Sequence, residues 1–222
     1  MTVTVTLSAN AGVALNIGGR RVWVDALHEK RDPPFSTLSP RLQQQMLSSE
    51  AFQNPEFICY THFHDDHYSP RLTQAAQKLW PNARVMIPED GWGREVRVES
   101  KGLSLRFVRL THEGAQYAQV PHYGIVLSCN GKNIFLSGDC ALASDELTQA
   151  LQGIPIHLML LDFPWLTHPK GKAYLHRHFP DVPKIAYHLP FAEDDVFGYR
   201  KAAGRTDAAL LQDPLQTVTM EI

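Results

Sequence analysis

The chain is poor in cysteine, with three in 222 residues. Cys59, Cys129 and Cys140 are an odd number at wide spacing, and two of them fall in expected strands. A disulfide framework is therefore not expected, because small secreted scaffolds use even sets of cysteines. This cysteine usage favours a reducing compartment, and we expect a cytoplasmic protein.

Runs of basic residues and long apolar runs are also missing. The formal net charge is −2, from 21 Lys and Arg against 23 Asp and Glu, and the two signs are interleaved. Binding to a phosphate backbone needs a basic surface, so we expect a small-molecule substrate and no nucleic acid. No apolar run reaches the length of a membrane span. The first nineteen residues contain no Lys or Arg, so neither a membrane nor a secretory signal is expected.

No Gly-, Ser- or Pro-rich linker divides the chain, and no short-period repeat or low-complexity tract occurs. Hydrophobic residues make up 44% and charged residues 20% of the chain, which is ordinary for a globular protein with a substantial core. We therefore expect a single domain over residues 1–222. Strands come first and then alternate with helices, and this order occurs twice, which indicates two similar halves.

Alternating β-branched residues and turn signals predict most of the strands. The expected strands are residues 2–7, 12–17, 20–25, 56–60, 84–87, 95–98, 103–110, 122–129, 132–137, 156–161, 184–188 and 217–222. The expected helices are residues 40–49, 70–80, 145–152 and 193–203. Pro40 and Pro70 suit the first position of a helix. Residues 27–39 and 163–180 are expected to be largely loops.

Histidine is enriched locally. Of eleven histidines, three fall within six positions of the stretch 61–67, Thr-His-Phe-His-Asp-Asp-His. An apolar run before it predicts a buried strand, which would present the stretch as a loop on a rigid scaffold. Side chains alternate along an extended chain, so His62 and His64 point the same way and could chelate one ion. Asp66 and His67 then face a second position, and two ions about 3.5–4 Å apart can share bridging groups.

Polar side chains recur where other expected strands end. His112 follows the strand 103–110, Asp139 follows the strand 132–137, and His188 ends a short strand. Ligands of open α/β sheets bind at the carboxyl ends of the strands, so these side chains can converge with the stretch 61–67. Imidazole and carboxylate are ligands for zinc and for harder first-row ions. The sequence therefore predicts a metal site.

With these residues in this order, the chain resembles the metallo-β-lactamase superfamily from about residue 11 to its end. The landmarks that carry the resemblance are Asp25 at the end of an early strand, His62-x-His64-x-Asp66-His67, His112, Ser137-Gly138-Asp139, and His188 in Ala186-Tyr187-His188-Leu189-Pro190. The resemblance implies an α+β fold, an αββα sandwich of two mixed sheets with helices on the outer faces. The site would lie at one edge. The Asp66-His67 pair looks like the hydrolase and lactonase branches.

The resemblance also implies a set of ligands. A first ion would be held by His62, His64 and His112, and a second by Asp66, His67 and His188, with Asp139 between them. Asp25 would be a structural acid behind the ligands. The cofactors would be two divalent transition-metal ions, with zinc favoured and manganese or iron as alternatives.

Two neighbouring positions leave alternatives open. His122 could supply the third motif instead of His112. We prefer His112 because it stands at a break between strand and loop, whereas His122 opens the next strand. Cys140 follows the Gly-Asp pair, where the family commonly has threonine or a small residue. Cys140 could lie beside the ions, although a buried small apolar side chain is the preferred interpretation.

The expected activity is hydrolysis of a small ester, lactone, thioester or similar bond. Two cations lower the pKa of a bridging water, which makes hydroxide available near neutral pH. Asp66 is the expected catalytic residue, which holds the hydroxide or passes its proton to the leaving group. A small-molecule or cyclic-nucleotide phosphodiesterase is the alternative, and a non-catalytic metal-binding protein is less favoured. Two-iron oxygen or nitric-oxide reductases resemble the motif set, but they carry an additional flavin domain.

Candidates for a substrate pocket follow the strand 156–161. Phe163 and Trp165 could form an apolar wall, although core packing explains them equally well. His168 could bind an anionic group, but a solvated helix face is the preferred interpretation.

Overall fold

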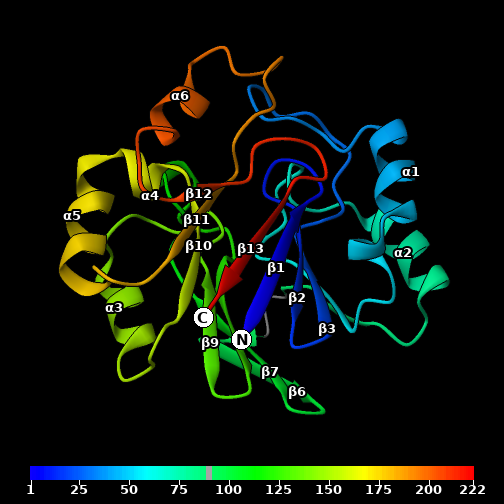
Figure 1. Ribbon diagram of the computed structural model, residues 1–222, viewed down its shortest axis with the longest axis horizontal. Coiled ribbons are helices and arrows are strands. Elements are labelled where there is room, and N and C mark those ends of the chain that lie inside the picture. Colours follow the sequence, from blue (N-terminus) through cyan, green and yellow to red (C-terminus); the bar gives the residue numbers. More distant parts are fainter. Residues whose placement is uncertain (89–91) are drawn as a thin grey trace.

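The computed structural model describes residues 1–88 and 92–222, and in these residues two β-sheets pack face to face (Figure 1). The first sheet has the order β13 (Thr217–Glu221), β1 (Thr2–Leu7), β2 (Val13–Ile17), β3 (Arg20–Val24), β4 (Phe57–Cys59), β5 (Arg84–Met86). The second has the order β12 (Ala209–Leu210), β11 (Lys184–Tyr187), β10 (Leu158–Asp162), β9 (Lys132–Leu136), β8 (Tyr123–Cys129), β7 (Leu103–Arg109), β6 (Glu95–Ser100).

Helices cover the outer faces of both sheets (Figure 1). On the first sheet lie α1 (Pro40–Ser48) and α2 (Pro70–Leu79), and on the second lie α3 (Asp145–Leu151), α4 (Pro164–Thr167) and α5 (Pro169–His178). The short helices α6 (Tyr199–Ala203), η1 (Glu50–Phe52) and η3 (Ala115–Tyr117) complete the described elements. The αββα sandwich expected from the sequence is confirmed. No helix in the described ranges is long and apolar enough to cross a membrane.

The strand β10 illustrates how the layers pack. Leu158 and Leu160 belong to the core that includes residues of both sheets, whereas Met159 and Leu161 belong to the core beneath α3 and α5. Successive side chains of a strand point to opposite faces, so both faces of β10 are buried. This explains why its sequence is a continuous apolar run, as is usual for strands covered on both sides.

The direction of the strands determines where the site lies. In the first sheet β3, β4 and β5 are parallel, and in the second β9, β10, β11 and β12 are parallel. Strand β7 is antiparallel to β8, which is antiparallel to β9, so β7 runs in the direction of β9. Within each sheet, the carboxyl ends of these strands therefore point to one edge.

Two sequence predictions about helices were wrong. The helix expected at 193–203 begins at Tyr199, because the Asp195 carboxylate accepts hydrogen bonds from the backbone N–H groups of Tyr199 (2.8 Å) and Arg200 (3.1 Å) and so caps a later first turn. The stretch after Asp162 was expected to be largely loop, with a helix face preferred for His168, but it forms α4 and α5. Pro164 and Pro169 lie at their starts, where a missing N–H costs nothing.

Candidate metal centre

The seven ligand candidates from the sequence meet where β4, β7, β9 and β11 end. Their ligand atoms form groups of three in which all atoms lie within 4.8 Å of one another. The groups are His62, His64 and His112; His62, His67 and Asp139; Asp66, His67 and His188; and Asp139, Asp162 and His188. We call the group of His62, His64 and His112 the first position. We call the group of Asp66, His67 and His188 the second position.

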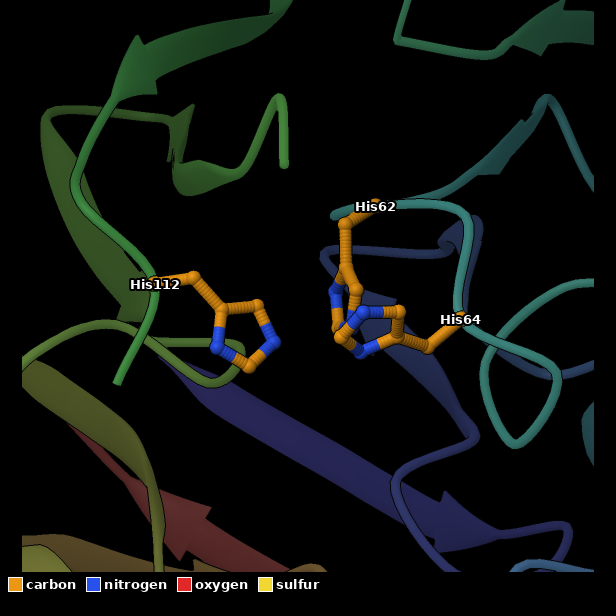
Figure 2. Close-up of side chains that lie close together, drawn as sticks. All are labelled: His62, His64 and His112. Atoms are coloured by element: carbon orange, nitrogen blue, oxygen red, sulfur yellow. The ribbon is translucent and has the colours of Figure 1, made fainter. Parts of the chain in front are cut away.

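The first position consists of three imidazoles. Figure 2 shows His62 and His64, from the loop after β4, with His112 facing them from the other side. The ring centroids are 4.5 Å apart for His62 and His64, 4.8 Å for His62 and His112, and 4.7 Å for His64 and His112. His62 and His112 are buried and His64 is half-buried. This spacing leaves a cation-sized position between three nitrogen ligands.

Hydrogen bonds fix the tautomers of His62 and His112. The Thr61 hydroxyl donates to Asp25 (2.6 Å), so the His62 Nδ1, 3.0 Å from the same hydroxyl, must donate to it. The His112 Nδ1 donates to the Glu113 carbonyl oxygen (2.7 Å). Each Nε2 therefore carries a lone pair. Both Nε2 atoms are buried and have no hydrogen-bond partner in the described part of the chain, as a metal ligand requires.

The second position combines a carboxylate with two imidazoles. The His188 Nε2 lies 3.3 Å from Asp66 Oδ2, and the His67 Nε2 lies 3.7 Å from the same oxygen. Asp139 lies between the two positions. Its Oδ2 is 3.2 Å from the His67 Nε2 and 3.9 Å from the Nε2 atoms of both His62 and His112. An oxygen within reach of both positions can bridge two cations.

Asp25 is buried directly after β3 and supports the loop 61–67 from behind. Its Oδ1 accepts a hydrogen bond from the Thr61 N–H (2.8 Å), and its Oδ2 accepts one from the Thr61 hydroxyl. The same Oδ2 lies 3.0 Å from the His67 Nδ1. Asp25 has a φ of 51°, in the left-handed region that Asp tolerates better than most residues. It therefore positions the start of the loop and one candidate ligand.

Two residues of the site were missed in the sequence. Asn10, in the turn between β1 and β2, donates from its Nδ2 to Asp66 Oδ2 (3.0 Å), and its carbonyl accepts from the His188 N–H (3.2 Å). Asp162, the last residue of β10, places Oδ1 3.2 Å from the His188 Nδ1. Asp162 carried the signal used for Asp139, an acid where a strand ends. Asn10 carried none, because asparagine is ordinary in a turn.

The structure distinguishes the two histidines considered for the third motif. His112 lies in the first position with His62 and His64. His122 is fully buried, and its Nε2 accepts a hydrogen bond from the Asp139 backbone N–H (2.9 Å). Burial lowers the pKa of His122 to about 3, so the ring is neutral and can accept. His122 thus holds the backbone of Asp139.

Cys140 and the pocket candidates lie outside the groups of candidate ligands. Cys140, Phe163 and Trp165 are buried in the core between the second sheet and its helices. Burial raises the pKa of the Cys140 thiol, which keeps it protonated. His168 is exposed at the start of α5, where its Nδ1 accepts from the Lys170 N–H (3.2 Å). Core packing and helix capping account for these side chains.

The buried carboxylates of the site favour positively charged groups beside them. Burial lowers the pKa of His67, but Asp139, Asp66 and Asp25 outweigh it, and the net pKa lies well above the usual value. Burial also lowers the pKa of His188, yet the carboxylates around it raise the net value to about 10. Without metal, protons on these two rings balance the carboxylates. Divalent cations would replace them, because metal ligation requires neutral imidazole.

No family model matches the chain, and no curated protein matches it significantly. Solved structures do match along its whole length. YhfI from Bacillus subtilis, described as a metallo-β-lactamase fold protein, is 10% identical, with 99% of each chain covered and a TM-score of 0.63. Igni18 from Ignicoccus hospitalis, described as a metallo hydrolase, is 14% identical, with 100% of each chain covered and a TM-score of 0.60.

CmlA from Streptomyces venezuelae, described as a diiron β-hydroxylase, is 10% identical, with 99% of this chain and 54% of that chain covered and a TM-score of 0.57. Because these structures are only 10–14% identical to the chain, their similarity shows the fold alone. The chain has the metallo-β-lactamase fold, which confirms the fold that the sequence motifs implied.

Proposed function

We propose that the protein is a metal-dependent hydrolase with a dinuclear centre. One observation carries the proposal. The Nε2 atoms of His62 and His112 are buried, make no hydrogen bond to any described residue, and each lie 3.9 Å from Asp139 Oδ2. A buried polar atom without a partner costs about 1–3 kcal/mol. Cations between these atoms would remove that cost, so the donor set fits a metal site.

The ligand types favour zinc. Three imidazoles in the first position, and two imidazoles with Asp66 in the second, match the nitrogen and oxygen donors that zinc prefers. Iron is the main alternative, since CmlA, of which 54% is matched by this chain, is described as a diiron β-hydroxylase. When bound, two divalent ions lower the pKa of a shared water and polarise the attacked oxygen of the substrate.

Asp66 is the residue we assign to proton transfer. Its Oδ2 is held by the Asn10 Nδ2 (3.0 Å) and faces the His188 Nε2 (3.3 Å). Burial raises its pKa, but His67 and His188 outweigh this, and the net pKa lies below the ordinary value. The carboxylate is therefore ionised at neutral pH. It can accept a proton from the attacking water and return it to the leaving group.

The open side of the first position suits a small molecule. His64 is half-buried, and Tyr117 is 39% exposed with its ring 4.8 Å from that of His64 and 5.0 Å from that of His112. An exposed aromatic ring beside the ligands can contact the apolar part of a substrate. We propose a small ester, lactone or thioester as substrate, with no nucleic acid or membrane partner. The three free, buried cysteines suit a cytoplasmic location.

A substrate screen with a matched pair of variants tests the proposal. Metal-loaded protein is assayed on esters, lactones, thioesters and small or cyclic phosphodiesters. Asp66→Ala is compared with Asp65→Ala, which removes the neighbouring, exposed carboxylate that pairs with Lys30. We expect turnover of an acyl substrate, a loss of about 10²–10⁴-fold in Asp66→Ala, and no change in Asp65→Ala.

Two outcomes of the screen would count against this assignment. Turnover of phosphodiesters alone would favour the phosphodiesterase alternative. Full activity of Asp66→Ala with both ions still bound would refute the role of Asp66.

A further inference from the structure

We propose that the two metal positions are unequal, and that Asp162 and Asp25 make the second position the tighter one by orienting its imidazoles. This inference rests on the proposed dinuclear centre. It adds Asp162 as a positioning residue, and it predicts which position fills first when metal is scarce.

Both imidazoles of the second position have a carboxylate behind them. The His67 Nδ1 lies 3.0 Å from Asp25 Oδ2, and the His188 Nδ1 lies 3.2 Å from Asp162 Oδ1. The Asp25 side chain is fully buried, and that of Asp162 is 14% exposed. A carboxylate in this place keeps the proton on Nδ1 and makes Nε2 a more basic ligand, and its loss typically weakens metal binding 10–100-fold.

The imidazoles of the first position have weaker support. The His62 Nδ1 faces the Thr61 hydroxyl, and the His112 Nδ1 faces the Glu113 carbonyl oxygen, both of which are neutral. The ring of His64 makes no hydrogen bond within residues 1–88 and 92–222, and it is half-buried. Neutral acceptors fix a tautomer but contribute less to ligand basicity than a carboxylate does.

Asp162 acts on a ring that is already confined. His188 has a φ of 60°, and its N–H donates to the Asn10 carbonyl (3.2 Å). The Phe35 ring stacks on the His188 ring, with centroids 4.2 Å apart and an interplanar angle of 14°. These contacts hold the plane of the ring but do not choose between its two nitrogens. Asp162 makes that choice, because it is the nearest acceptor to Nδ1, with Asp139 Oδ1 further away at 3.5 Å.

The backbone ties Asp162 to the bridging residue. The Asp162 N–H donates to the Ser137 hydroxyl (3.0 Å), and Ser137 lies two residues before Asp139. The acid that orients His188 is therefore fixed relative to Asp139. Among the described residues, the group that forms the first position contains no carboxylate, and the nearest one is Asp139, whose Oδ2 lies 3.9 Å from the Nε2 atoms of His62 and His112.

The distribution of charge, like the tautomers of the imidazoles, favours tighter metal binding at the second position. The second position has Asp66 as a ligand and two further carboxylates, Asp25 and Asp162, one imidazole away. The first position consists of three imidazoles and includes no carboxylate. A divalent cation in a buried site is attracted to nearby negative charge. We therefore expect the second position to fill first and to empty last.

Cobalt(II) added in steps to metal-free protein tests the order of filling. His64→Ala removes one imidazole of the first position, so cobalt signals that persist in this variant belong to the second position. We expect these signals to appear first in the wild-type titration. In the His64→Ala background, Asp162→Ala should lower the affinity for the remaining cobalt ion 10–100-fold. Asp162→Asn, which keeps a neutral acceptor, should weaken it less, and Asp65→Ala should leave it unchanged.

Proton NMR of the cobalt-loaded protein distinguishes positioning from other roles. A protected, exchangeable Nδ1–H signal of His188 should be present in the wild type and absent in Asp162→Ala. If Asp162 were itself a ligand, or merely structural, this signal would be missing from the wild type or unaffected by the substitution. Either result overturns the proposal.

The outcome also separates this inference from the proposed function. Two bound ions and normal turnover, with the first position filling first, would refute the inference alone. A wild-type protein that binds fewer than one ion per chain would refute the dinuclear centre itself. If Asp162→Ala does not fold, Asp162→Asn still removes the carboxylate charge with a smaller change in packing, and weaker binding at the second position than in the wild type is the expected result.

Discussion

Substitutions of Asp25 should separate the stability of the site from its ability to bind metal. Asp25 is fully buried and serves three donors: the N–H and the hydroxyl of Thr61, at 2.8 and 2.6 Å, and the His67 Nδ1 at 3.0 Å. Two different variants remove different parts of this arrangement. Asp25→Ala removes every acceptor, whereas Asp25→Asn retains the shape and one oxygen.

The magnitude for Asp25→Ala follows from the donors left behind. The Thr61 hydroxyl can rotate toward another acceptor, but the Thr61 N–H and the His67 Nδ1–H cannot. Each unpaired buried donor costs about 1–3 kcal/mol, so the free energy of unfolding should fall by about 2–6 kcal/mol. This is a large part of the roughly 5–15 kcal/mol of a typical domain.

Asp25→Asn should be milder for stability but severe for metal. The amide oxygen can still accept from the Thr61 N–H, while the NH₂ group takes the place of Oδ2. The His67 Nδ1 must then accept a hydrogen bond, which moves its proton to Nε2. A protonated Nε2 cannot bind a cation, so affinity at the second position should fall 10–100-fold.

Urea unfolding of the metal-free variants and metal analysis of the loaded ones measure the two effects. We expect a low unfolding midpoint for Asp25→Ala, and a near-normal midpoint with reduced metal for Asp25→Asn. Wild-type stability of Asp25→Ala, or wild-type affinity for both ions in Asp25→Asn, would refute this role of Asp25.

Two further predictions concern pH and steric fit. In metal-free protein, burial lowers the pKa of His188 but neighbouring carboxylates raise it to about 10, so stability should decline as pH rises from about 6.5 to 10. Burial lowers the pKa of His28 to about 4, so unfolding takes up a proton between about pH 4 and 6.5 and stability should decline toward acid. Urea unfolding should therefore show a maximum near pH 6.5, and a monotonic profile would contradict this. Gly138→Ala would place a Cβ 2.6 Å from the His122 Nε2, whereas Gly131→Ala meets nothing within 4 Å although both have positive φ. Both substitutions strain the backbone by about 1–2 kcal/mol. Gly138→Ala should lower the free energy of unfolding by about 1–3 kcal/mol more and should also reduce the metal content. Equal effects of the two substitutions in thermal unfolding and metal analysis would refute the steric argument.

The sequence was informative where chemistry and periodicity act locally. The stretch 61–67 concentrates three histidines and two aspartates after a short apolar run, and the strands before His112, Asp139 and His188 can be recognised in the sequence. Because those strands run toward a common edge, order along the chain was enough to expect their convergence.

The sequence was uninformative where a contact depends on the tertiary fold. Asn10 reaches Asp66 and His188 across 56 and 178 positions of the chain, and a turn asparagine gives no hint of such partners. Trp165 looked like part of a loop. It is fully buried because Pro164 begins a helix that packs on the second sheet.

The distinction between the two candidate histidines also needed coordinates. His112 and His122 are both buried next to expected strand boundaries. They differ in the partner of one nitrogen, since the His122 Nε2 accepts the Asp139 N–H and the His112 Nε2 has no partner among the described residues. The residues around the two histidines in the sequence do not indicate which of them has this hydrogen-bond partner.

The metal content of protein purified without chelator tests the central claim most directly. Elemental analysis should find two divalent transition-metal ions per chain, with zinc as the expected element. Fewer than one ion per chain, in protein whose circular dichroism shows an intact fold, would contradict the account.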